Sequence, residues 1–215
     1  MTESPNPAAT RLNALLAEAF QAPLDTAQTL RFEALLSLFL RWNARINLTS
    51  ICDGEGILKR HFVESIACAH ALPVGIDTLL DFGSGAGFPG LPIALCRPEI
   101  AVTLAESQGK KAAFLLEAVR VLGVAAKVHS GRAETLTAAF DCVTLRAVDK
   151  MERAVQSAVR LVRSGGWLAL MTTTTGLPAL KASAGAEFTW DPEHLLPGSD
   201  DRLLALGNRA ISSPS

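Results

Sequence analysis

The sequence predicts an α/β fold in which a doubly wound, mostly parallel sheet follows an all-helical N-terminal extension. From Asp77 onward, short apolar runs typical of strands alternate with helical patterns, which is the arrangement of βαβ units. Before that point, apolar residues recur at helical spacing. Of the 215 residues, 49% are hydrophobic and 19% are charged, which indicates a globular chain that can bury one large core. We therefore expect a helical extension over 1–72 and an α/β domain over 73–215, joined in one structural unit.

The extension is expected to hold two helices. Residues 1–10 are rich in Pro, Ser, Asn and Thr, so we expect a frayed terminus there. Asp25 and Gln28 have the spacing of a capping box, and the apolar residues that follow predict a helix over about 26–43. A second helix is expected over about 55–70, ending before Pro73.

The α/β domain is predicted element by element. Strands are expected at 78–82, 101–105, 126–129, 140–146 and 166–171, with a last one at 202–206. Helices are expected at 88–96, 108–122 and 149–163. The stretch 176–200 has little periodicity, so no element is assigned to it.

The composition narrows the class of protein. No apolar run reaches the roughly 20 residues that a membrane helix needs, and the N-terminus lacks the pattern of a signal peptide. The four cysteines, Cys52, Cys68, Cys96 and Cys142, stand singly with no CxxC pair, which favours reduced thiols in a cytoplasm and no metal site. The net charge of −1 means that nucleic-acid binding would need a local basic patch.

The stretch LLDFGSGAGFPG (79–90) places four glycines directly after a predicted strand. From Gly85 it matches GxGxxG, the dinucleotide fingerprint, and from Asp81 it matches the first motif of methyltransferases that use S-adenosylmethionine. The second register is favoured because the strand ends at Phe82, which makes Gly83 the turn glycine. Counted from Gly83, Phe88 stands at the sixth position of the dinucleotide fingerprint, where it is too large for close packing of helix on strand. Asp81 would then meet the cofactor's ammonium group, directly or through water.

Two further segments indicate a nucleoside. Glu106 ends the second predicted strand about twenty residues after the glycines, where a carboxylate can accept hydrogen bonds from both ribose hydroxyls. Because both candidate cofactors contain this ribose, Glu106 does not separate them. Ala133 and Glu134 follow the third strand, where they would flank an adenine.

Six stretches together resemble a known family. They are RWNARINLTSI (41–51), KRHFVESIA (59–67), LLDFGSGAGFPGLPIA (79–94), LAESQGKKAAFL (104–115), GRAETL (131–136) and FDCVTLRAV (140–148). In this order and spacing they resemble the bacterial small-subunit rRNA guanine-N7 methyltransferases of the glucose-inhibited division protein B type. The resemblance implies a class I, Rossmann-like methyltransferase fold and S-adenosyl-L-methionine as cofactor.

The resemblance also assigns residues. It implies cofactor contacts at Gly83, Phe88, Ala133, Glu134 and Arg146, to which the motif reading adds Asp81, Gly85 and Glu106. It implies a substrate-side role for Asn47, His61 and Ser65. The chain departs from the family pattern at Glu64, where Asp is usual, at Asp149-Lys150, and at Met171-Thr172, where a Lys-Gly pair is common.

The residues after the fourth strand agree with methylation at guanine N7. TLRAVD (144–149) has neither the Asn/Asp-Pro-Pro-aromatic motif of amine methylation nor a cysteine nucleophile, since Cys142 falls inside the strand. N7 carries its own lone pair, so the reaction needs positioning and no covalent intermediate. We expect Arg146 to hold the cofactor's carboxylate, and Asn47 and His61 to position the substrate.

A local basic surface is expected to contact the RNA. Its candidates are Arg31, Arg41, Arg45, Lys59, Arg60, Lys110 and Lys111. The expected partner is 16S rRNA or the small ribosomal subunit, bound by a monomer. Because the overall charge is weak, a structured RNA or ribonucleoprotein is the expected substrate rather than a short oligonucleotide.

Two alternatives from other classes are compatible with the sequence. An NAD(P)-dependent oxidoreductase would use the GxGxxG register, although 215 residues leave little room for a substrate domain. A catalytically idle RNA-binding module would keep the fold without turnover. Stabilisation by NAD(H) as against S-adenosylhomocysteine separates the first alternative from a methyltransferase.

Overall fold

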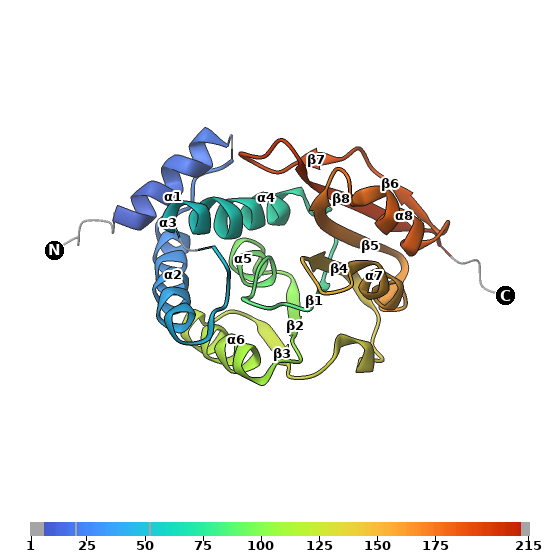
Figure 1. Cartoon of the computed structure of the whole chain (residues 1–215), viewed down its shortest axis with the longest axis horizontal. Helices are drawn as coiled ribbons and strands as arrows, with labels where there is room; N and C mark the ends of the chain where they lie inside the picture. The colour runs from blue at the N-terminus through green and yellow to red at the C-terminus, as the bar shows by residue number, and fades with distance from the viewer. Residues whose placement is uncertain (1–6, 20, 52, 212–215) are drawn as a thin grey trace.

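The computed structural model describes residues 7–19, 21–51 and 53–211, and its centre is an eight-stranded sheet (Figure 1). The strand order is β3-β2-β1-β4-β5-β8-β6, and β7 also pairs with β8. The strands are β1 (Thr78–Phe82), β2 (Ala101–Ala105), β3 (Ala126–His129), β4 (Phe140–Arg146), β5 (Val162–Thr173), β6 (Phe188–Trp190), β7 (His194–Leu195) and β8 (Arg202–Arg209). The predicted α/β class and the first four strands are confirmed.

The sheet is parallel from β3 to β5 and antiparallel around β8. The strand order reverses at β1, which pairs with β2 on one side and β4 on the other. Ligands of open α/β sheets bind at the carboxyl ends of the strands beside such a switch point. The fold therefore places the glycine-rich loop after β1 at the natural binding edge.

Helices cover both faces of the sheet. They are α1 (Pro7–Glu18), α2 (Thr26–Ile46), α3 (Gly54–Ile57), the π-helix η1 (Leu58–Val63), α4 (Glu64–Ala71), α5 (Gly90–Cys96), α6 (Gly109–Leu122), the 3₁₀ turn η2 (Ala133–Thr135), α7 (Met151–Val159) and α8 (Leu177–Ala184). Figure 1 shows α7 and α8 on one side of the sheet and the N-terminal helices with α5 and α6 on the other.

Alternation along the strands divides the core into two clusters. Leu79 packs into the cluster under the N-terminal helices, whereas its neighbour Leu80 packs under α7 and α8. Successive side chains of a strand point to opposite faces of the sheet, and here both faces are covered by helices. The first cluster joins Leu16 and Phe39 of the extension to Val102 of β2. The extension therefore shares a continuous core with the sheet.

In the extension, one predicted feature is confirmed, and the terminus and the second helix differ from the prediction. Pro7 begins α1, so residues 7–10 are helical rather than frayed, because Leu12, Leu15 and Leu16 bury one face of this helix. Residues 1–6 lie outside the described part of the chain. The capping box at α2 is confirmed, with Asp25 Oδ1 accepting from Gln28 N at 2.7 Å and Gln28 Oε1 accepting from Asp25 N at 3.1 Å. The single helix expected over 55–70 is divided into α3, η1 and α4.

The C-terminal third shows the larger corrections. The helix expected over 149–163 is only Met151–Val159, and the strand expected over 166–171 extends over Val162–Thr173. The longer strand pairs with β8, itself longer than expected, from Trp167 to Thr173, and Val162 pairs with Phe140. The unassigned stretch 176–200 contains α8, β6 and β7. Helix α5 begins at Gly90 rather than residue 88.

Two kinds of feature are absent from the described residues. None of their helices is both long and apolar enough to cross a membrane. Within the same residues, no group of three or more His, Cys, Asp and Glu side chains is arranged to hold a metal ion. Cys68, Cys96 and Cys142 are free thiols, and Cys52 lies outside the described residues.

Candidate functional site

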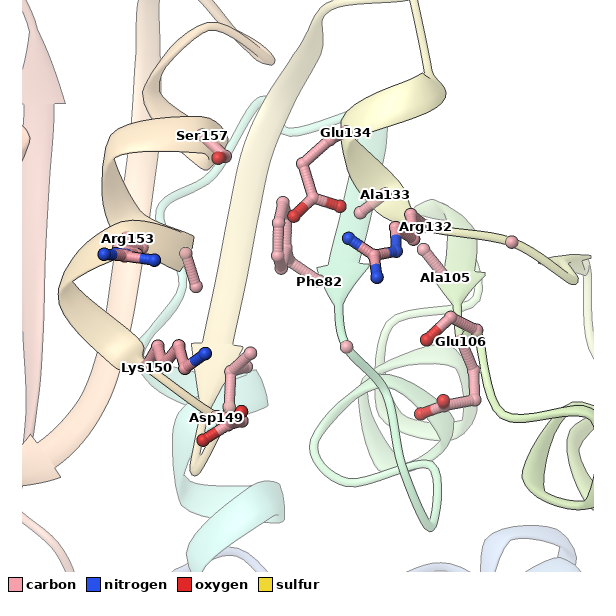
Figure 2. Close-up of a pocket in the computed structure, with 15 residues that line it drawn as sticks. Phe82, Ala105, Glu106, Arg132, Ala133, Glu134, Asp149, Lys150, Arg153 and Ser157 are labelled. Atoms are coloured by element: carbon pink, nitrogen blue, oxygen red, sulfur yellow. The ribbon is translucent and has the colours of Figure 1, made fainter.

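Two adjoining cavities lie along the glycine-rich loop at the carboxyl ends of β1, β2 and β4. The first has a volume of about 470 Å³ and lies between the ends of β1 and β2, η2 and α7 (Figure 2). The second, of about 420 Å³, lies between the glycine-rich loop, the segment after α2 and the end of β4. They share Gly83, Glu106, Ser107, Val148 and Asp149, so they form one continuous groove.

The first residue of the loop, Gly83, has a conformation that glycine adopts without strain. Its φ is +71°, and a Cβ there would stand 3.1 Å from Cγ2 of Val148. The backbone of the β1 loop thereby comes close to the loop after β4. This confirms Gly83 as the turn glycine and brings main-chain atoms to the junction of the two cavities.

Glu106 links the loops that follow β1 and β2. Its side chain is buried, and Oε2 accepts from Gly85 N at 2.9 Å while Oε1 accepts from Gln108 N at 2.7 Å. Each carboxylate oxygen has a second lone pair, so the group can still accept two hydrogen bonds from a ligand. Figure 2 shows Glu106, Ala133 and Glu134 on one wall of the first cavity and Lys150 and Arg153 opposite.

Asp81 lies beneath the glycine-rich loop, and the side chain lines neither cavity. It is 1% exposed; Oδ2 accepts from Gly90 N at 3.2 Å and Oδ1 accepts from the Thr144 hydroxyl at 3.0 Å. Burial raises the pKa of Asp81 to about 6. In place of the expected contact with a cofactor ammonium, the carboxylate ties β1 to β4 and to the start of α5.

The loop after β4 holds backbone strain beside the groove. Ala147, which lines the second cavity, has a φ of +50°, a value that residues with a Cβ adopt rarely. Lys150 has the same positive φ and precedes α7. Strained residues of this kind collect at functional sites. Val148 lies between these two residues and close to Gly83.

Arg146 enters the second cavity from the end of β4 and is already well bound. Its guanidinium donates to Glu64 Oε2 at 2.9 Å, to Ser65 Oγ at 3.3 Å and to the carbonyl of Arg60. Burial lowers the pKa of Arg146, and the Glu64 carboxylate opposes this effect. The planar group has five N–H donors, so the contacts above leave donors for a ligand carboxylate.

His61 and Phe88 form a stacked pair on the wall of the second cavity. Their ring centroids are 5.0 Å apart with an interplanar angle of 20°. His61 Nε2 lies 2.8 Å from the Thr49 hydroxyl, while Nδ1 is buried without a hydrogen-bond partner. Burial, together with the charges of Arg146 and Arg60, lowers the pKa of His61 to about 3. The imidazole is therefore neutral at physiological pH.

Replacing His61 with glutamine should change how stability responds to acid. The folded-state pKa of about 3 lies below the unfolded value of about 6.5, so below pH 6.5 the unfolded state binds a proton that the folded state does not. Through this group, the free energy of unfolding of the wild type should fall by at most about 2 kcal/mol between pH 7 and pH 5. The variant lacks the imidazole, so this part of the fall should be absent. Urea unfolding at the two pH values measures the difference. The control is His194→Gln, at an exposed histidine on β7, which should keep the wild-type response.

Comparisons with known proteins identify the family of this chain. The family model described as GidB, rRNA small subunit methyltransferase G, matches residues 28–184. The protein named Ribosomal RNA small subunit methyltransferase G from Roseiflexus sp. (strain RS-1) is 41% identical over 70% of this chain and 67% of its own length. The protein of the same name from Xanthomonas campestris pv. campestris (strain B100) is 39% identical over 78% of this chain and 77% of its own length. The chain belongs to this family.

Solved structures confirm the fold of this family member. Cofactor-bound Rv0187 from MTB superposes with a TM-score of 0.62 over 98% of this chain and 100% of that one, at 19% identity. The S-adenosylmethionine-dependent O-methyltransferase from Thermotoga maritima gives 0.58 over 82% and 73%, at 13% identity. The family and the class I fold make the chain an S-adenosylmethionine-dependent methyltransferase, which decides against the oxidoreductase alternative.

The residues present fit this cofactor. A Cβ at Gly83 would fill the narrow space between the glycine-rich loop and Val148, where the two cavities meet. Glu106 keeps free lone pairs where a ribose would lie. In this arrangement Glu106 would hold the ribose, Ala133 and Glu134 would flank the adenine, and Arg146 would bind the carboxylate. S-adenosylmethionine supplies an activated methyl group on a sulfonium.

The substrate-side candidates of this family member are only partly gathered at the groove. Asn47 ends α2 in the left-handed conformation (φ 52°), is exposed and lines neither cavity, but its turn directs Leu48 and Thr49 along the second cavity. Lys111 lines that cavity, whereas Lys59 pairs with Glu55 at 2.8 Å. The remaining basic candidates, Arg31, Arg41, Arg45, Arg60 and Lys110, are exposed and line neither cavity.

The sequence did not indicate several residues of the groove, nor Arg202, which pairs with Glu64 beside it. Thr49 was part of the quoted RWNARINLTSI stretch, but nothing marked its hydroxyl as the partner of His61. Arg153 and Ser157 reach the first cavity from one face of α7, where a helical charge ordinarily indicates a solvated surface. Arg202 meets Glu64 across 138 residues of sequence, so no local pattern could have indicated it.

Proposed function

We propose that this protein transfers a methyl group from S-adenosylmethionine to N7 of a guanosine in small-subunit (16S) rRNA, as a monomer in the cytoplasm. The observation that carries the proposal is the continuous groove, in which a nucleoside-sized cavity beside Glu106 opens past Gly83 into a second cavity beside His61 and Phe88. The class of RNA follows from the relatives, which are named as methyltransferases of small-subunit ribosomal RNA.

The second cavity is suited to positioning rather than proton removal. His61 is neutral, so it does not repel a positively charged sulfonium, and its stack on Phe88 provides a flat apolar wall against which a purine can lie. Arg146 is held in place by Glu64, whose Oε2 lies 2.9 Å from its guanidinium. Guanine N7 attacks through its own lone pair, so an aligned approach of the two reactants is the main requirement.

The test is methylation of defined RNA substrates. The purified protein is incubated with labelled S-adenosylmethionine and either a 16S rRNA transcript, assembled small subunits or a short oligonucleotide, and the nucleosides are identified by mass spectrometry. We expect 7-methylguanosine in the long or assembled substrates and little in the oligonucleotide. RNA binding without methyl transfer to any substrate would establish the idle RNA-binding module instead. A methyl group on another atom would refute the N7 assignment alone.

A further inference from the structure

A third cavity, of about 270 Å³, adjoins the second one on the side of β8. We call it the arginine cavity; its lining includes Arg60, Glu64, Arg146, Met171, Thr173 and Arg202. Arg146 and Ala147 line both the second cavity and the arginine cavity, so the two are adjacent. Arg202 has no role in the cofactor site described above.

Positive charge is in excess around this cavity. Glu64 is 1% exposed, and its Oε2 accepts from Arg146 at 2.9 Å while Oε1 accepts from Arg202 Nε at 2.8 Å. Arg60 Nε lies 3.9 Å from Oε1, so three guanidinium groups face one carboxylate. Asp201, 63% exposed and 3.6 Å from Arg202, offsets this only weakly because solvent screens it. The arrangement therefore favours an anion in the cavity.

The backbone at Arg202 is fixed by its neighbours. Its N–H donates to the Ser199 hydroxyl at 2.9 Å and its carbonyl accepts from Leu196 N at 2.8 Å. Antiparallel pairing sets it opposite Thr173, which also lines the cavity. Since Nε is occupied by Glu64, the terminal nitrogens of Arg202 remain for a ligand in the cavity.

A surface path continues from the arginine cavity. A groove of about 580 Å³ shares Met151 and Thr172 with it and extends to Lys150 and Arg153 on one side and Thr175 on the other. The groove also contains Glu152, but its other polar side chains are cations and hydroxyls, the groups that contact phosphate and sugar oxygens. The path leads from the arginine cavity to the surface beside α7 and α8.

We infer that Arg60 and Arg202 bind a backbone phosphate of the RNA next to the target guanosine, with buried Glu64 as the positioning residue that holds the guanidinium of Arg202. The inference rests on the proposed function. A guanidinium fork matches the geometry of phosphate oxygens. The second cavity would take the base beside His61 and Phe88, and the adjacent arginine cavity then lies where the phosphate of the same strand passes.

Arg202→Gln tests this inference. We expect the affinity for the 16S rRNA transcript to fall about tenfold and the slope of log affinity against log salt to decrease by about one. The dissociation constant for S-adenosylmethionine should stay within about twofold, since Arg202 lines neither cofactor cavity. Arg202→Lys should retain the salt slope but lose part of the affinity, because an ammonium lacks the fork. Arg120→Gln, at an exposed arginine in the last turn of α6, is the matched control and should behave as wild type.

A second variant distinguishes loss of the phosphate contact from loss of folding. Because Arg202 pairs with a buried carboxylate, its replacement can lower stability. Arg60→Gln removes the other half of the phosphate site from a half-exposed side chain 3.9 Å from Glu64, and it should give the same loss of RNA affinity and salt slope.

The outcomes separate the inference from the proposed function. If the wild type methylates rRNA but both variants keep its RNA affinity and salt slope, the inference is wrong and the proposed function stands. If the variants weaken binding of S-adenosylmethionine while RNA binding is unchanged, the arginines serve the cofactor's carboxylate and the inference is again wrong. If the wild type does not methylate rRNA, the proposed function itself fails.

Discussion

Replacing Glu106 with alanine should weaken S-adenosylmethionine binding by at least about 100-fold, because two charge-assisted hydrogen bonds to a ribose contribute roughly 3–6 kcal/mol together. The carboxylate also accepts from Gly85 N and Gln108 N, so its removal leaves two main-chain donors unpaired and loosens the loops after β1 and β2. Isothermal titration calorimetry of the purified protein gives the dissociation constant directly.

Glu106→Gln separates ribose recognition from support of the loop. Glutamine keeps the length and one acceptor oxygen, so it should bind the cofactor with an affinity between those of the wild type and the alanine variant. Glu99→Ala, at an acid outside the groove that pairs with Arg97, is the control for loss of a carboxylate alone. Wild-type affinity in Glu106→Ala would show that the ribose lies elsewhere, and the cofactor placement would have to be abandoned.

The first four strands were predicted with their observed bounds because their surroundings leave little freedom. β1, β2 and β4 are short, mainly apolar runs that are largely buried. The segment 160–165 was ambiguous, since RLVRSG fits the end of a helix as well as the start of a strand. Pairing of Phe140 with Val162 decided for the strand, and that contact is set by tertiary structure.

The candidate site was predictable where it follows the strand ends. Gly83, Glu106 and Arg146 gather around one groove because β1, β2 and β4 are parallel neighbours. What the sequence could not indicate is how side chains share partners. Glu64 was noted as a departure from the family pattern, and only the structure shows that this carboxylate is buried between Arg146 and Arg202. Partnerships of this kind depend on packing between distant segments.

Gly90→Ala should lower the free energy of unfolding by about 3 kcal/mol, since overpacking of a rigid core costs of that order. A Cβ at Gly90 would lie 2.3 Å from Cδ2 of Leu104 and 2.6 Å from Oδ2 of Asp81, both of which are buried. Backbone or side chains must therefore move, and the bond from Gly90 N to Asp81 moves with them. Chemical denaturation measures the loss.

Gly109→Ala is the matched control, because Gly109 is the first residue of α6 as Gly90 is of α5, yet no atom lies within 4 Å of its added Cβ. Its stability should equal or slightly exceed that of the wild type, since alanine favours helix. If Gly90→Ala also kept the wild-type free energy of unfolding, the prediction would be wrong. Leu104 and Asp81 would then be able to move away from the added Cβ at little cost. If stability falls as expected, cofactor affinity should fall with it, because Asp81 accepts hydrogen bonds both from Gly90 N through its carboxylate and from the Ser84 hydroxyl of the glycine-rich loop through its carbonyl.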